Sequence, residues 1–164
     1  MKSGDAVGTE VIIRPVVESD WSAVIEIIRE FVSFHAQRDP HFKKVDGHGE
    51  MFADYVRENL RTSNAIMLVA EIQDLIVGYC FALIQRKPPV YSEAVYGYID
   101  NLAVLNSYQR RGIGSLLYGH ALNWFKTRNV VRIELAAAIT NEKSTSFWRK
   151  MGFKPFMETL FTKI

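Results

Sequence analysis

The spacing of apolar residues changes along the chain and divides it into helical and extended segments. Between Trp21 and Phe31 apolar residues recur every three or four positions, which is typical of an amphipathic helix. Ser19 and Asp20, just before this stretch, offer oxygens that can cap its first turn. From Ala65 the apolar runs become continuous and rich in β-branched residues, which indicates strands. The pattern predicts strands at 11–16, 65–71, 75–85, 95–104 and 130–138, helices at 21–31, 50–60, 113–128 and 141–151, a loop or broken helix at 33–49, and an extended segment at 153–164.

The order of these elements, β-α-α-β-β-β-α-β-α-β, indicates the fold class. It suits an α/β (α+β) protein in which helices cover both faces of a mixed central β-sheet. The 164 residues are enough for one domain with a sizeable core and too few for two. Residues 1–10 are polar and are expected to form a tail, so residues 11–164 are expected to be the single domain.

Composition and charge exclude several broad classes. With 48% hydrophobic and 23% charged residues, the chain is typical of a globular protein and not of a disordered one. The net charge of +2 is small and the basic residues are scattered, so nucleic-acid binding is not favoured. The apolar run from Leu75 to Ile84 is far shorter than the ~20 residues of a membrane span, and residues 1–10 do not resemble a signal peptide. We therefore expect a cytoplasmic protein whose single thiol, Cys80, is buried in a strand.

The most informative segment is Gln109-Arg-Arg-Gly-Ile-Gly114, which joins the strand at 95–104 to the helix at 113–128. Glycines at such a junction let the backbone turn tightly, so that N–H groups converge where the helix adds partial positive charge. This arrangement suits a phosphate or pyrophosphate, and Arg110 and Arg111 add positive charge at its rim. The alternative is a glycine turn that only begins a helix. A Walker loop would need Gly-Lys-Ser/Thr, and a dinucleotide fingerprint would need a third glycine; the segment has neither.

Three segments together resemble a known family. Gln-x-x-Gly-x-Gly at 109–114, after a strand and before a helix, resembles the acetyl-CoA-binding motif of the Gcn5-related N-acetyltransferases, the GNAT superfamily. Asn141-x-x-Ser144-x-x-Phe147-Trp148-x-x-x-Gly152-Phe153 is similar to that family's later Asn-x-x-Ala-x-x-Phe-Tyr-x-x-x-Gly-Phe block. Ile13-Arg-Pro15 and Asp20 resemble its usual first strand and helix start, so the resemblance covers about residues 11–164.

The resemblance implies a GNAT fold, in which a splayed pair of strands, here 95–104 and 130–138, opens a cleft for acetyl-CoA. In that family the pantetheine arm pairs with the backbone of the earlier strand, and the pyrophosphate lies on backbone amides of the glycine loop. The cofactor-binding residues that it implies are Leu102, Ala103, Val104, Gln109, Arg110, Arg111, Gly112, Ile113, Gly114, Ser115, Asn141, Phe147 and Trp148. From the residues alone, Asn141 can also be a helix N-cap, and Phe147 can also be a core residue.

The resemblance also implies a reaction, the direct attack of a primary amine on a thioester to give an amide and free CoA. Asp100 is the candidate general base, because several relatives carry a Glu there; pairing with a nearby arginine is its alternative role. A backbone N–H near Leu102 suits the developing oxyanion. Many relatives use a Tyr as general acid where Trp148 stands, and an indole N–H has no proton to give at usable pH.

Three functions remain open. The first is an N-acetyltransferase that acts on an amine of a small molecule or peptide. The second is an acyl-CoA-binding module that is catalytically weak or inactive, which the missing Tyr favours. The third is an adaptor on the same fold that binds a nucleic acid or a protein, and the small net charge gives it little support. Dimers are common in the family, so a homodimer is also an expectation. The four histidines lack metal-ligand spacing, so no metal is expected; two of them, His35 and His41, fall in the loop that in this family often covers the acceptor site.

Overall fold

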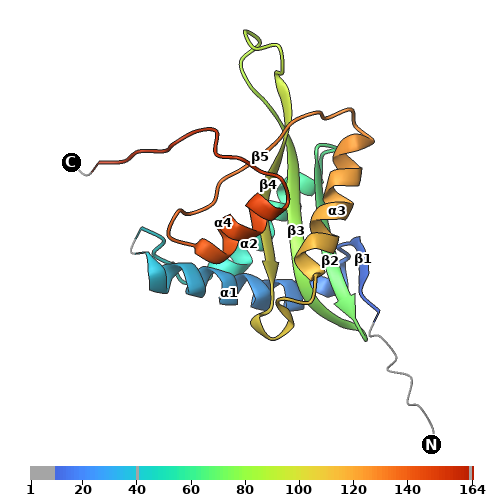
Figure 1. The fold of residues 1–164 in the computed structure, drawn as a ribbon. Helices are drawn as coiled ribbons and strands as arrows, with labels where there is room; N and C mark the ends of the chain where they lie inside the picture. The colour runs from blue at the N-terminus through green and yellow to red at the C-terminus, as the bar shows by residue number, and fades with distance from the viewer. Residues whose placement is uncertain (1–9, 40, 163) are drawn as a thin grey trace, which may run out of the picture.

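The computed structural model describes residues 10–39, 41–162 and 164, and Figure 1 shows how their helices and strands are arranged. The tail expected at 1–10 lies outside the described residues except for Glu10. In chain order the elements are β1 (Ile12–Pro15), the 3₁₀ helix η1 (Glu18–Asp20), α1 (Trp21–Arg38), α2 (His48–Leu60), β2 (Ala65–Ile72), β3 (Leu75–Arg86), β4 (Val95–Val104), the 3₁₀ helix η2 (Asn106–Tyr108), α3 (Ile113–Lys126), β5 (Ile133–Leu135) and α4 (Glu142–Lys150).

The five strands form one sheet in the order β1-β2-β3-β4-β5. The pairs β1–β2, β2–β3 and β3–β4 are antiparallel, and the pair β4–β5 is parallel. A two-residue turn joins β2 to β3, with φ of 49° at Gln73 and 63° at Asp74, as a tight hairpin of this kind requires. The mixed sheet, with helices on both of its faces, confirms the expected fold class.

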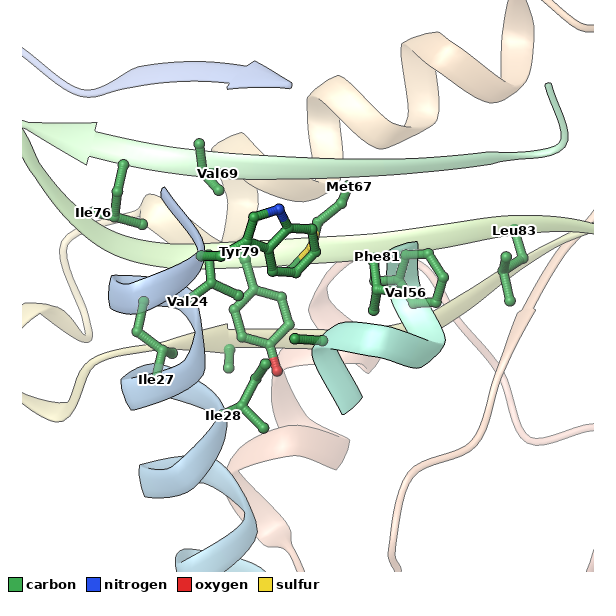
Figure 2. Close-up of a cluster of buried hydrophobic side chains, with 13 residues drawn as sticks. Val24, Ile27, Ile28, Val56, Met67, Val69, Ile76, Tyr79, Phe81 and Leu83 are labelled. Carbon is green, nitrogen blue, oxygen red and sulfur yellow. The ribbon is translucent and has the colours of Figure 1, made fainter. Parts of the chain in front are cut away.

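Two clusters of buried side chains lie on opposite faces of the sheet. On one face, α1 and α2 contribute residues such as Val24 and Val56, which pack with Tyr79 of β3 (Figure 2). On the other face, α3 contributes residues such as Leu117, which belongs to the same cluster as Cys80 of β3. Alternate residues of a strand point to opposite faces, and β3 is therefore an almost unbroken apolar run because both faces are covered. Cys80 is fully buried, as expected, and burial raises the pKa of its thiol to about 12.

The segment expected as a loop or broken helix at 33–49 is helical over its first part. α1 continues through Arg38 and α2 begins at His48, so the irregular stretch is shorter than expected. The rings of Phe31 and His35 lie 4.5 Å apart, one helical turn from each other. Contacts between residues four apart stabilise a helix, and polar composition alone does not reveal them.

Two extended segments also differ from expectation. β5 has only residues 133–135 in place of the 130–138 expected, because it leaves β4 after three residue pairs. No strand forms in 153–162, where the last strand of the expected order would lie. Ring contacts hold this segment instead of sheet hydrogen bonds: Phe153 lies 5.3 Å from Trp148, and Phe156 lies beneath Arg132 at 4.2 Å. Among the described residues, no helix is both long and apolar enough to cross a membrane.

Candidate active site

The sheet is split between its last two strands. β5 pairs with β4 only at Gly97, Tyr98 and Ile99. β4 continues beside β3 as far as Val104, so its other edge has no partner from residue 100 onward among the strands that the structure describes. This open edge is the splay expected between the strands at 95–104 and 130–138.

A β-bulge interrupts β4 at the start of the open edge. Ile99 lies opposite Ala82 of β3, and Asn101 lies opposite Phe81. Two steps along β4 therefore correspond to one step along β3, and Asp100 is the extra residue. An inserted residue of this kind reverses the direction of the backbone groups that follow it.

Two hydrogen bonds show this reversal. The N–H of Gly97 donates to the carbonyl of Arg132 next to β5, at 2.8 Å, whereas the N–H of Leu105 donates to the carbonyl of Val77 in β3, at 2.9 Å. Gly97 and Leu105 are an even number of residues apart, so in a regular strand both would face the same neighbour. The bulge at Asp100 accounts for the switch.

After the bulge, the backbone groups of Leu102 and Val104 face the open edge, and those of Ala103 face β3. The side chain of Gln109 confirms this direction, because its Nε2 donates to the carbonyl of Val104 at 3.0 Å. The same Nε2 donates to the Oδ1 of Asn106, also at 3.0 Å. Gln109 therefore ties the start of the glycine loop to the end of β4.

The glycine loop ends in a left-handed turn at the start of α3. Arg110 has a φ of 64° and Gly112 a φ of 81°, a region that glycine adopts easily and that few other residues do. The N–H of Leu116 donates to the carbonyl of Gly112 at 3.1 Å and begins the helix. The N–H groups of residues 113–115 therefore have no acceptor within the helix. Unpaired N–H groups at a helix start suit an anion, because the helix dipole adds partial positive charge there.

The two arginines of the loop differ in their surroundings. Arg111 donates to the carbonyl of Ser107 at 3.1 Å, and its guanidinium lies 5.0 Å from the centre of the Tyr108 ring. Arg110 is exposed, and its side chain has no hydrogen bond or ion pair with any residue that the structure describes. Arg111 therefore braces the loop, whereas the side chain of Arg110 extends into solvent.

α4 borders the loop on its other side. A methyl group placed at Gly114 would lie 3.4 Å from the ring of Phe147 and 3.6 Å from Leu102, so α3, α4 and β4 meet at this point. Asn141 is the N-cap of α4, and its Oδ1 accepts a hydrogen bond from the N–H of Ser144 at 3.2 Å. The capping role is thus confirmed, and Phe147 packs against the core as its alternative role required.

The side chain of Trp148, on α4, packs against α3. Only 8% of its surface is exposed, and its ring lies 4.8 Å from that of Phe147 and 5.7 Å from that of Tyr118. No residue in the described part of the chain accepts a hydrogen bond from its indole N–H. Burial raises the pKa of Tyr118, and the nearby Cys80 adds to this effect.

Asp100 is a partly buried carboxylate that has no side-chain partner among the described residues. No side chain in the described ranges forms an ion pair or hydrogen bond with it, so the expected alternative, pairing with an arginine, is not found there. Burial raises the pKa of Asp100. Burial, followed by the charge of Asp100, also raises the pKa of Tyr55 on α2 and of Tyr98 on β4. Sequence reasoning did not single out these tyrosines, because Tyr55 comes near Asp100 only through the packing of α2 on the sheet.

A second group of rings lies at the end of α1. The ring of His35 lies 5.5 Å from that of Phe42, tilted by 60°, and His41 lies 5.3 Å from Phe161 of the C-terminal segment. Burial, and then the charge of Arg38, lower the pKa of His35. His35 thus lies on α1 and not in the loop where it was expected, and His41, in the loop after α1, contacts the C-terminal segment, which the sequence did not predict. A shallow pocket of ≈ 200 Å³ lies between the end of α1 and the start of α4, lined by Phe34, Arg38, Thr140, Asn141, Glu142 and Lys143.

Comparison with known proteins places the chain in a family. The model of the acetyltransferase (GNAT) family matches residues 23–153. The chain therefore belongs to this family, in agreement with its motifs, its mixed sheet and its splayed strands. No group of three His, Cys, Asp or Glu side chains in the described ranges could hold a metal ion.

Individual relatives cover parts of the chain. An N-alpha-acetyltransferase from Sulfurisphaera tokodaii is 28% identical over 105 residues, which are 59% of this chain and 61% of that protein. N-alpha-acetyltransferase 30 from Schizosaccharomyces pombe is 35% identical over 85 residues, 52% of this chain and 55% of that protein. The chain thus spans less than two thirds of these relatives. The solved structure of aminoglycoside N-acetyltransferase AAC(6')-Iy in complex with CoA matches with a TM-score of 0.76 at 16% identity, over 97% of both chains, and so shares the fold.

Proposed function

We propose that this protein is an N-acetyltransferase that moves an acetyl group from acetyl-CoA to a primary amine by direct attack in a ternary complex. One observation supports this most strongly: the open edge of β4 runs from the unpaired carboxylate of Asp100 to the free N–H groups at the start of α3. Relatives named for N-alpha acetylation and for aminoglycoside acetylation support an amine of a peptide or of a small molecule as acceptor.

The chain fits CoA along this edge. Leu102 offers its carbonyl and Val104 offers its N–H to an extended pantetheine arm, while the carbonyl of Val104 is held by Gln109. The N–H groups of residues 113–115 and the side chain of Arg110 suit the pyrophosphate. Phe147, whose ring lies beside Gly114, and Trp148 supply an apolar surface for the pantetheine arm.

Asp100 is the proposed general base. A primary amine with a pKa near ~10.4 is almost wholly protonated at neutral pH, so the site has to remove a proton before the nitrogen can attack. The raised pKa of Asp100 makes it a stronger base than an ordinary aspartate. Because Asp is one methylene shorter than the Glu of several relatives, it takes the proton through a bridging water.

Negative charge develops on the carbonyl oxygen and then on the leaving sulfur, and the protein stabilises the first of these through its backbone. The N–H of Leu102 faces the open edge and donates to the carbonyl oxygen as negative charge develops there. The carbon–nitrogen bond then forms and the carbon–sulfur bond breaks. Trp148 cannot protonate the sulfur. A thiol pKa near ~8.5 makes the thiolate a tolerable leaving group; the second proton of the attacking nitrogen passes to water as the amide forms, and the thiolate takes one proton from water.

A panel of amines, read by the release of free CoA thiol, tests this proposal. With a working amine, Asp100→Asn is expected to reduce kcat about 100-fold or more at pH 7, and the loss should shrink towards pH 9, where free amine is plentiful. Asp74→Asn, in the exposed β2–β3 turn, is the matched control and should leave kcat unchanged. A deficit of Asp100→Asn that is flat across pH would contradict the role of base.

Trp148 supports a second candidate function, an acyl-CoA-binding module with weak or no catalysis. This residue stands where many relatives carry the Tyr that protonates the leaving group, and indole offers no such proton. Tight binding of acetyl-CoA without turnover of any amine in the panel would favour this second function over the first.

A further inference from the structure

A buried hydrogen bond joins β3 to β4 beside the bulge. Tyr79 is completely buried, and its hydroxyl donates to the Oδ1 of Asn101 at 2.9 Å. In the register of the sheet, Tyr79 lies opposite Ala103. Its ring, which extends from β3 into the core cluster (Figure 2), therefore reaches back along β4 to the residue that follows Asp100.

A change of register by one residue would give Tyr79 another partner. Without the bulge, Asp100 would lie opposite Phe81 and take the place on the sheet that Asn101 now occupies. The hydroxyl of Tyr79 would then meet the carboxylate of Asp100. The backbone of Leu102 would at the same time turn away from the open edge and towards β3.

We propose that the hydrogen bond between Tyr79 and Asn101 is the register lock of β4, which holds the bulge in place. In the other register the buried hydroxyl would be paired with a carboxylate, and burying that charge costs more than burying the neutral amide of Asn101, so Tyr79 favours the register that brings Asn101 to it. That register leaves the carboxylate of Asp100 free and keeps the backbone of Leu102 on the open edge. Tyr79 and Asn101 are positioning residues, since both act through their neighbours.

The inference rests on the proposed function where it concerns Asp100 as a base and CoA as the ligand of the open edge. The direction of the Leu102 backbone is a property of the fold, and the amide shifts of residues 100–104 report it without CoA and without turnover. Failure of the proposed function, seen as no acetylation of any amine, therefore leaves the test of the register lock intact.

The test compares Tyr79→Phe and Asn101→Leu, which remove one partner each and keep similar volumes. Tyr96→Phe is the matched control, because the Tyr96 hydroxyl donates to the Oε1 of Gln85 at 2.7 Å in the same sheet, away from the bulge. The measurements are the amide ¹H and ¹⁵N shifts of residues 100–104 and the Kd for CoA by calorimetry. Each test variant should move these shifts and weaken CoA binding about five-fold, the scale of one hydrogen bond.

The double variant Tyr79→Phe/Asn101→Leu should bind CoA no more weakly than either single variant, because both remove the same bond. Tyr96→Phe should show the shifts and affinity of the wild type. Folded test variants that melt earlier but keep wild-type shifts at 100–104 and wild-type CoA affinity would show that the bond is only structural. Losses of affinity that add up in the double variant would also overturn the proposal.

Discussion

Gly112 offers a sharp test of the anion site, because its side-chain position is open. A methyl group there would meet no atom within 4 Å. The φ of 81° disfavours most residues, but Asn and Asp tolerate the left-handed region better than others. Gly112→Asn and Gly112→Asp are therefore a matched pair with the same size and similar backbone strain, and they differ by one negative charge.

Coulomb's law gives the size of the expected difference. A carboxylate about 5 Å from each of the two pyrophosphate charges costs roughly 0.8 kcal/mol per charge in water, or about 1.7 kcal/mol in all. The Asp variant should thus bind CoA about 17-fold more weakly than the Asn variant at low salt. Screening at physiological salt, with a Debye length of about 8 Å, roughly halves this energy, so that the ratio falls to about five-fold.

Calorimetric titration of both variants with CoA, at low salt and again at high salt, is the assay. An acidic residue at a helix start stabilises the helix by about 0.3–1 kcal/mol, so the Asp variant should melt no earlier than the Asn variant. Loss of affinity in the Asp variant then cannot come from unfolding. Equal affinities of the two folded variants at low salt would refute the placement of the pyrophosphate at residues 109–115.

Three further predictions concern Asp100, Trp148 and the packing of the sheet. Because the pKa of Asp100 is raised in the folded protein, its contribution to stability is complete below pH 3.8 and is lost as pH rises through the raised pKa. Asp100→Asn should therefore melt at a higher temperature than the wild type at pH 7, and this difference in Tm should disappear in acid. Trp148→Phe should keep most of the turnover and Trp148→Tyr should match or exceed it, whereas Trp148→Ala should lose CoA affinity and about 3–5 kcal/mol of stability; a Phe variant that binds CoA and folds but has no turnover would refute a packing role. Gly97→Ala should lower the free energy of unfolding in urea by about 1–3 kcal/mol, because its methyl group would lie 2.6 Å from the ring of Phe125. The control Gly119→Ala, where a methyl group meets nothing within 4 Å, should instead raise it by roughly 0.5–1 kcal/mol.

Elements that bury one or two complete faces could be predicted from the sequence. β4 begins and ends where the apolar pattern placed it, at Val95 and Val104, and α3 begins at Ile113 as expected. The glycine loop and the start of α3 could also be predicted, because a positive φ at Gly112 and a free helix start are local properties of the chain.

The parts that could not be predicted depend on contacts between distant segments. The bulge at Asp100 arises from how β4 is paired with β3, and period-two alternation within one strand does not reveal an inserted residue. The length of β5 depends on where β4 stops pairing with it. The lack of a partner for Asp100, and its proximity to Tyr55, are properties of the packed helices and have no signal within the strand itself.

The short seam between β4 and β5 also governs how the molecule opens. β5 pairs with β4 over three residue pairs, and the Lys87–Glu134 ion pair and the rings of Phe147 and Trp148 add further contacts to β5 and α4. β1 to β4 share longer antiparallel ladders. Regions with few ladder bonds unfold locally at the lowest free-energy cost, so the amides of 133–150 should exchange hydrogen before those of the central strands. A ligand in the split would contact both sides of the seam and stabilise the state in which they are together. Among the strand pairings that the structure describes, the one between β4 and β5 is the shortest, and a ligand bound in the split would stabilise it.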